Sequence, residues 1–229
     1  MASARDRFKE GVRAVAPLLL GTIPFGLIVG VTIAATKIGN LAGWATSVII
    51  FAGAAQLALI DLVDTGAIAF VLIATPIVIN LRMAMYSAAL ATYFRKLSPI
   101  DRLWMPYLLT DQTFVMSMAR FRPDEDPVTI KWYYLGVGTT LWTTWLLATT
   151  VGVVVGAEVP VEWSLDFTIA LVFLALLARA IAARPALVAA VVGGVVAVLS
   201  LDMPSGTGIM VATVAGVTAG AIADWRLNQ

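Results

Sequence analysis

Residues 66–93, GAIAFVLIATPIVINLRMAMYSAALATY, decide the fold class, because this long apolar run contains a single charged side chain, Arg82. A helix needs about 20 apolar residues to cross a hydrocarbon core about 30 Å thick. The run is long enough to cross with some tilt. It therefore predicts a transmembrane helix with a guanidinium near its middle.

The composition of the whole chain extends this prediction. Of its 229 residues, 60% are hydrophobic and 13% are charged, and the mean hydropathy is +0.92. A soluble domain carries about 25% charged residues and about 45–50% apolar ones. Because so much apolar surface cannot be buried in one globule of this size, the chain is predicted to be a polytopic membrane protein embedded in a lipid bilayer.

Two absences exclude whole classes of chemistry. The chain has no cysteine and no histidine, so disulfides, thiol redox chemistry, zinc sites with these ligands and histidine-based triads are excluded. Fifteen basic and 14 acidic residues leave no charge excess for a nucleic acid partner. We expect neither an enzyme nor a metal or other cofactor, and we expect the function to reside in the transmembrane body.

The apolar segments predict an all-α protein with about six to eight membrane segments. Lipid-exposed backbone must satisfy its own hydrogen bonds, which favours helices. Residues 1–13 form a basic stub and residues 14–229 a single transmembrane permease domain. The predicted segments are 14–36, 42–60, 66–93, 104–120, 132–156, 166–183, 186–201 and 207–223.

Basic residues place the N-terminus in the cytoplasm, because Lys and Arg concentrate on that side. The loop with Arg95, Lys96 and Arg102 has the same character as the stub. If both are cytoplasmic, an even number of crossings must separate them, yet three segments do. Either segments 42–60 and 104–120 are re-entrant or broken, or all eight segments cross the membrane. We favour re-entrant segments. An inverted repeat is compatible with this topology.

Prolines and glycines also predict broken helices. The first segment holds Pro17, Pro24 and Gly26, and the third holds Pro76. An interior proline leaves one backbone carbonyl without its helical partner and kinks the helix. We expect a break near Pro24 that exposes carbonyls to a substrate, although transmembrane helices also tolerate proline without a functional reason.

The polar residues inside the segments are the candidate site, because each is costly in hydrocarbon. Arg82 offers a planar fork for a carboxylate, and Asp111 is the only carboxylate deep in an apolar stretch. They either form a structural ion pair or contact the substrate, and the two roles are compatible. Gln112 follows Asp111, and Asn80 precedes Arg82 by two residues.

Gln56 ends the run Phe51-Ala52-Gly53-Ala54-Ala55-Gln56. Its small residues, Gly53 among them, let a helix or a ligand approach the backbone closely. Gln56 is either part of a substrate site or a hydrogen bond between helices, and the sequence leaves both open.

The chain resembles a known family in several ordered motifs. They are a Pro-x6-Pro-Phe-Gly helix from Pro17 to Gly26, Phe51 to Gln56, Asn80-Leu81-Arg82, Leu109-Thr110-Asp111 with Thr113-Phe114, and Leu165-Asp166-Phe167. Together they are similar to the AzlC family, the large subunit of bacterial branched-chain amino acid exporters. The resemblance implies a Glu after the Thr-Asp pair, where this chain has Gln112, so Asp111 is the sole candidate proton carrier.

The resemblance implies export of leucine, isoleucine, valine or methionine together with a small AzlD-like membrane subunit. We expect a proton-coupled secondary exporter in the bacterial cytoplasmic (inner) membrane. Its substrate and coupling residues would be Pro24, Gly53, Gln56, Asn80, Arg82, Asp111 and Gln112. The alternative is a non-transporting membrane scaffold, in which the buried polar residues only join helices.

Overall fold

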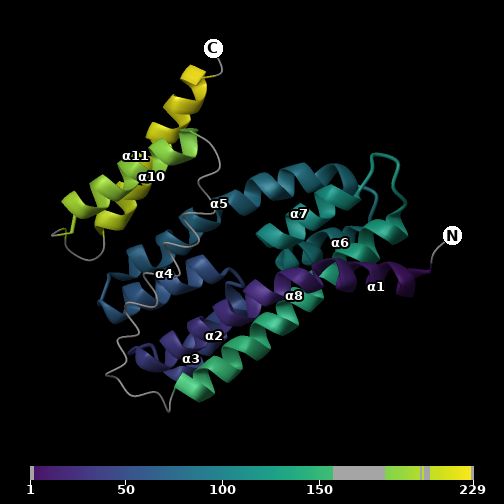
Figure 1. Cartoon of the computed structure of the whole chain (residues 1–229), viewed down its shortest axis with the longest axis horizontal. Coiled ribbons are helices and arrows are strands. Elements are labelled where there is room, and N and C mark those ends of the chain that lie inside the picture. Colours follow the sequence, from purple (N-terminus) through teal and green to yellow (C-terminus); the bar gives the residue numbers. More distant parts are fainter. Residues whose placement is uncertain (1–2, 157–183, 202, 204–206, 228–229) are drawn as a thin grey trace.

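The protein is almost entirely helical in a computed structural model that describes residues 3–156, 184–201, 203 and 207–227 (Figure 1). No strand occurs among these residues. The elements are α1 (Ala4–Val15), η1 (Ala16–Leu18), α2 (Leu19–Ala35), α3 (Asn40–Ile49), α4 (Gly53–Asp64), α5 (Ala69–Phe94), α6 (Pro99–Trp104), η2 (Met105–Leu108), α7 (Asp111–Arg120), α8 (Pro127–Gly156), α10 (Arg184–Leu199) and α11 (Thr207–Leu227).

The described residues contain four helices that are long and apolar enough to cross a membrane: Ala4–Ala35, Ala69–Phe94, Pro127–Gly156 and Thr207–Leu227. The all-α membrane class is thereby confirmed. The helix Arg184–Leu199 is apolar but shorter. The predicted segment 166–183 and the motif at Leu165 lie outside the described residues, so the total of six to eight segments stays a prediction.

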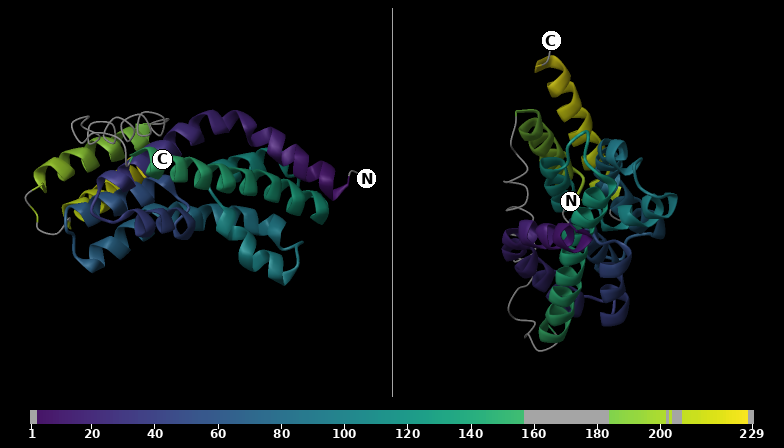
Figure 2. Two further views of the ribbon diagram at one scale, coloured as in Figure 1. Left: turned by 90° about the horizontal axis from the view of Figure 1, so that it is seen from below. Right: turned by 90° about the vertical axis from the view of Figure 1, so that its right-hand side faces the viewer.

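Helices α1–α2 and α8 pack side by side along the long axis of the molecule (Figure 2). A Cβ added at Gly30 would collide with the backbone of α8 around Gly152, and one at Gly152 with that of α2. Gly11 and Gly136 make the same kind of contact nearer the N-terminus. Gly11 contacts Gly136 and the later Gly30 contacts the later Gly152, so the two helices run parallel.

The basic stub is part of this first long helix. Ser3 and Asp6 form a capping box at the start of α1, with the Asp6 N–H donating to Ser3 Oγ over 3.2 Å. Only the short 3-10 turn at Ala16–Leu18 separates α1 from α2. With 32 residues, α1–α2 is about 48 Å long and extends beyond the hydrocarbon core.

The predicted segment 42–60 is a re-entrant hairpin, which we call the first hairpin (α3 and α4, Asn40–Asp64). The backbone N–H of Lys37, before α3, donates to Asp64 Oδ1 at the end of α4 over 3.0 Å. Both ends of the hairpin therefore lie on the same side. With 10 and 12 residues, its arms are about 15 and 18 Å long, about half the hydrocarbon thickness.

The break in the first hairpin lies at Ile50–Ala52. Phe51 has φ 41°, in the left-handed region that costs an L-residue about 1–2 kcal/mol. Its side chain is 6% exposed, so the packing of its ring holds this conformation. The left-handed residue reverses the chain between α3 and α4.

The predicted segment 104–120 belongs to a second re-entrant hairpin (α6, η2 and α7, Pro99–Arg120). Lys96 Nζ, before α6, donates to the carbonyls of Pro123 and Glu125, after α7, over 2.8 and 2.9 Å. Both ends again lie together. The chain bends at Leu109–Thr110, where the Thr110 side chain accepts the Thr113 N–H and caps α7.

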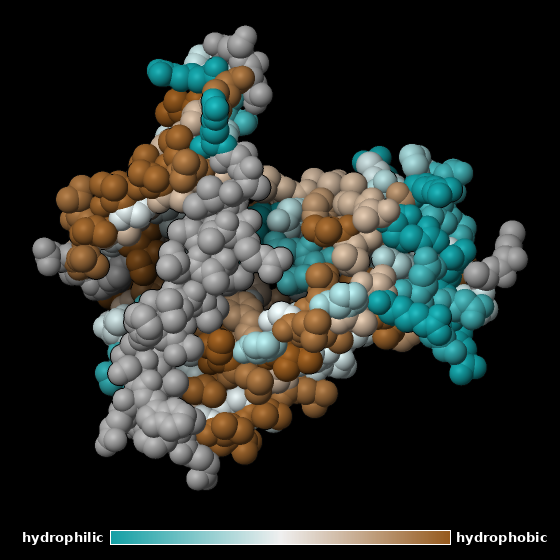
Figure 3. Space-filling view, in the orientation of Figure 1, coloured by the Kyte–Doolittle hydropathy of each residue, from teal (hydrophilic) through white to brown (hydrophobic). Residues whose placement is uncertain are grey.

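The hairpins give the chain a regular order. The span α1–α2 is followed by a hairpin entering from the Lys37 side, and the span α5 by a hairpin entering from the opposite, Lys96 side. A span plus a hairpin thus occurs twice with opposite direction, as in an inverted repeat. The basic residues of 1–13 and of the loop at Arg95 come to one end, as the favoured topology predicted. Figure 3 shows hydrophilic residues concentrated at this end.

The prediction that Pro24 breaks its helix is wrong. Helix α2 runs from Leu19 to Ala35 through Pro24, and α5 likewise continues through Pro76. Each proline removes one hydrogen bond, which the remaining turns of a long apolar helix tolerate. The breaks instead occur at Phe51 and at Leu109–Thr110, where the chain reverses.

Helices α10 and α11 form an antiparallel pair set apart from the rest (Figure 1). Gly216 faces Ala189 and Gly193, and Gly220 faces Pro185 and Ala189. Gly193, Gly216 and Gly220 therefore lie at the contact between the two helices, whereas a Cβ at Gly194 would meet no atom within 4 Å.

Single cysteines test the re-entrant topology, because the native chain has none. We expect Asn40→Cys and Thr65→Cys, at the two ends of the first hairpin, to react with an impermeant maleimide from one face of the membrane. Ile100→Cys and Asp124→Cys should react from the other face. Labelling of Asn40→Cys and Thr65→Cys from opposite faces would show that this segment crosses completely.

Candidate functional site

The tips of the two hairpins meet beside the middle of α5 and enclose a cleft of about 300 Å³. We call it the central cleft. This volume is at the lower end of the range for small-molecule sites. Its lining residues are Ile50, Phe51, Ala52, Asn80, Met83, Ala84, Ser87, Pro106, Tyr107 and Leu109.

Tyr107 joins the two hairpins at this cleft. Its Oη donates to the Val48 carbonyl of α3 over 2.5 Å and accepts from Trp142 Nε1 of α8 over 2.8 Å. The rings of Tyr107 and Phe51 lie with their centroids 6.2 Å apart. One side chain of the second hairpin therefore fixes the first hairpin and α8 together.

Asn80 and Ser87 are the polar side chains of α5 that line the central cleft, and Asn80 is the larger. Its Oδ1 atom is buried and has no hydrogen-bond partner among the described residues. A buried amide without a partner costs about 1–3 kcal/mol. A cleft that combines apolar side chains with the Asn80 amide and the Ser87 hydroxyl suits a largely aliphatic ligand that carries a hydrogen-bonding head group.

The N-terminus of α4 opens at the same cleft. Its N-cap residue, Ala52, lines the cleft and has no side chain that could accept the first N–H groups. These donors, together with the helix dipole, favour an anion. Asn80 and the start of α4 therefore present complementary groups, an amide and a set of backbone donors, within one cavity.

Arg82 and Asp111 form the predicted ion pair, with Nη1 and Oδ2 separated by 3.1 Å. Tyr86 Oη donates to Asp111 Oδ1 over 3.0 Å, and the Tyr86 ring stacks on Phe114 with centroids 4.2 Å apart. The side chains of Arg82 and Asp111 are 35% and 40% exposed. The cluster joins α5 to the start of α7, the returning arm of the second hairpin.

The structure separates Asn80 from this ion pair. Two residues along a helix correspond to a rotation of about 200°, so Asn80 and Arg82 point to nearly opposite faces of α5. Arg82 and Tyr86, four residues apart, share one face. The predicted polar cluster is therefore two groups, one in the central cleft and one between α5 and α7.

Gln56 joins the two arms of the first hairpin. It is fully buried, and its Nε2 donates to Thr46 Oγ1 and Ser47 Oγ of α3 over 2.8 and 2.7 Å. Its Oε1 has no partner among the described residues. A Cβ at Gly53 would collide with Phe25 and Trp145. Gln56 and Gly53 thus take part in packing the first hairpin, and their predicted substrate role stays a prediction.

The remaining predicted residues lie outside the central cleft. Pro24 is exposed within α2, and Gln112 is half-buried in the first turn of α7. Thr110 is the N-cap of that helix. Within the described ranges, no group of three or more His, Cys, Asp or Glu side chains could hold a metal ion.

Comparison with known proteins agrees with this architecture. The family model described as AzlC protein matches residues 17–159, which include both hairpins. The chain belongs to the AzlC family. An uncharacterized membrane protein of Archaeoglobus fulgidus is 30% identical over 219 residues, covering 91% of this chain and 92% of the relative. The inner membrane protein YgaZ of Escherichia coli K12 is 24% identical over 225 residues, covering 94% and 88%. No solved structure matches the chain.

Sequence reasoning missed two tyrosines of this AzlC protein. Tyr86 lies four residues after Arg82, so helical spacing alone places it beside the arginine. Tyr107 lies just before the bend of the second hairpin, but nothing in its local sequence indicates its bond to Val48. Trp145 and Tyr134 are buried in the core, whereas Trp142 bonds to Tyr107.

The bond between the hairpin tips predicts the effect of Tyr107→Phe. Loss of the hydroxyl leaves the Val48 carbonyl and Trp142 Nε1 without this partner, so we expect a loss of about 1 kcal/mol. In a protein of this size that lowers the melting temperature in detergent by about 2–4 °C. Tyr93→Phe is the matched control, because the Tyr93 hydroxyl makes no hydrogen bond within the described residues. Equal melting temperatures of both variants and the wild type would contradict the bridge.

Proposed function

We propose that this membrane protein is the large subunit of a secondary exporter for hydrophobic amino acids: leucine, isoleucine, valine and methionine. The observation that carries the proposal is the central cleft, where two re-entrant hairpins from opposite sides meet. Irregular backbone at membrane depth is tolerated where it lines a cavity, and transporters use such breaks to bind substrates. Membership of the AzlC family supports the proposal.

The cleft matches the chemistry of a zwitterion with an aliphatic side chain. The donors at the start of α4 suit the carboxylate, and the oxygen of Asn80 suits the ammonium group. Ile50, Met83 and Leu109 supply the apolar wall. This role is binding and release without a chemical step, so the proposed protein is a transporter subunit and not an enzyme.

Asp111 is the proposed proton carrier. The ion pair between Asp111 and Arg82 holds the second hairpin to α5. Protonation of the Asp111 carboxyl removes the charge that attracts Arg82. Breaking the pair frees the α7 arm to move, so a proton can change access to the central cleft. Proton exchange would thereby drive export.

Location and partner complete the proposal. The N-terminus, the Arg95 loop and the loop at Arg122 lie on the cytoplasmic side of a bacterial inner membrane, following the rule for basic residues. A small AzlD-like membrane subunit acts with this chain. The partner rests on the family resemblance alone, and co-purification with the product of a neighbouring short hydrophobic reading frame tests it.

Efflux of labelled leucine from loaded cells or vesicles tests the transport function. We expect Asn80→Ala to raise the KM for leucine about fivefold, which corresponds to one lost hydrogen bond of about 1 kcal/mol. Asn40→Ala, an exposed asparagine at the start of α3, is the control and should leave KM unchanged. If the wild type, with its partner present, exports no branched-chain amino acid and shows no thermal shift with leucine, the scaffold alternative is correct.

The coupling role of Asp111 predicts a change in pH dependence. We expect Asp111→Asn to abolish leucine efflux driven by a pH gradient, while leucine–leucine exchange across the membrane continues. Asp124→Asn, in the exposed loop after α7, should behave as the wild type. Wild-type efflux by Asp111→Asn at every pH would show that another group carries the proton.

A further inference from the structure

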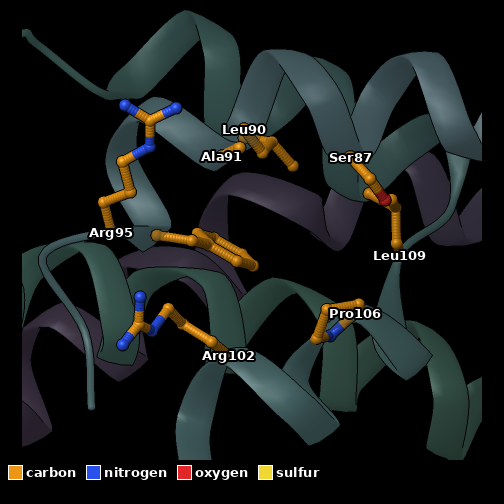
Figure 4. A pocket seen from close by; sticks show the side chains of 8 residues that line it. Ser87, Leu90, Ala91, Arg95, Arg102, Pro106 and Leu109 are labelled. Carbon is orange, nitrogen blue, oxygen red and sulfur yellow. The ribbon is translucent and has the colours of Figure 1, made fainter. Parts of the chain in front are cut away.

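A second cavity, of about 290 Å³, adjoins the central cleft (Figure 4). The two cavities share Ser87, Pro106 and Leu109. The second is otherwise lined by Leu90, Ala91, Phe94, Arg95 and Arg102, from the end of α5 and from α6. In Figure 4 both arginines lie on the side opposite Ser87 and Leu109. The arginines therefore line one end of the cavity, which we call its mouth, and the residues shared with the central cleft line the other end.

Neither Arg95 nor Arg102 has an acidic partner within the described residues, whereas Lys131 and Arg120 at the same end do. Lys131 Nζ lies 2.8 Å from Asp101, and Arg120 pairs with Glu10 and Glu125 at 2.6 and 2.7 Å. The Asp101 carboxylate accepts from Lys131 and Ser98, and the bond from Lys131 lowers its pKa. The positive charge at the mouth is thus not neutralised.

The wall between the mouth and the central cleft is apolar. Leu90, Ala91 and Phe94 lie on one turn and a half of α5, and Pro106 and Leu109 face them from the second hairpin. Two guanidinium groups beside such a wall suit a small molecule with one carboxylate and one aliphatic chain. The lining contains no acidic residue.

We propose that this second cavity is a vestibule in which Arg95 and Arg102 capture the carboxylate of an aliphatic amino acid before it moves past Ser87 into the central cleft. This inference rests on the proposed export function and adds a binding step to it. The aliphatic side chain lies against Leu90 and Phe94, and the ammonium group stays hydrated at the mouth. On reaching the central cleft, the carboxylate exchanges the arginines for the start of α4.

The test is leucine efflux by Arg95→Gln/Arg102→Gln, with leucine supplied from the Arg95 side. Loss of electrostatic attraction should raise the KM about three- to tenfold and leave kcat unchanged. The wild-type KM should rise with salt, because ions screen exposed charges, and the KM of the double variant should not. For leucinamide, which lacks the carboxylate, the KM of the double variant should equal that of the wild type.

Two controls separate this role from folding and from general surface charge. Arg122→Gln removes an exposed cation from the same end that does not line the cavity, and it should keep the wild-type KM. Arg95→Lys/Arg102→Lys keeps the charge and should restore most of the affinity. All variants should melt within the error of the wild type.

The outcomes are distinct. Wild-type efflux with an unchanged KM in the double variant overturns the vestibule and leaves the export function standing. If the double variant changes only how leucine efflux depends on the phosphatidylglycerol content of the vesicles, the arginines bind a lipid headgroup. That result overturns the vestibule as well. Absence of wild-type leucine efflux overturns the export function and, with it, this inference.

Discussion

The close parallel contact between α1–α2 and α8 is the constraint on which the rest of the molecule depends. Lipid is as apolar as a leucine side chain, so burial of apolar surface does not hold helices together in a membrane. Backbone contact at small residues does, and Gly30 against Gly152 allows it. The same pair forms the wall behind the first hairpin: Gly53 at the start of α4 packs on Phe25 of α2 and Trp145 of α8. A larger residue at any of these glycines would separate the surfaces that position the central cleft.

The polar groups of the interior divide according to what they hold. Gln56 joins the arms of one hairpin, Tyr107 joins the two hairpins, and Arg82 with Asp111 joins the second hairpin to α5. Asn80, which lines the central cleft, has a buried amide oxygen without a partner among the described residues. This division gives the protein a fixed frame, α1–α2 with α8, and two short elements attached by few polar bonds. Elements held by few bonds are those that can move during transport.

The sequence predicted more of the topology than of the site. Basic residues in the stub and at Arg95 required an even number of crossings between them, and the pairing of Lys37 with Asp64 confirms the re-entrant solution. Proline was a poor guide, because a long apolar helix tolerates Pro24, while the left-handed Phe51 carries no sequence signal. The pairing of Arg82 with Asp111 followed from their cost in hydrocarbon. Helical geometry could have placed Asn80 on the other face, but the position of Tyr107 depends on two distant hairpins meeting, which no local pattern contains.

The short hairpin arms have an electrical consequence. Each arm reaches about half the hydrocarbon thickness, and the two tips meet through Tyr107, Val48 and Phe51. A zwitterion bound between the tips carries no net charge. The transmembrane potential, worth about 2.3 kcal/mol per elementary charge for each 100 mV, therefore does no net electrical work on it.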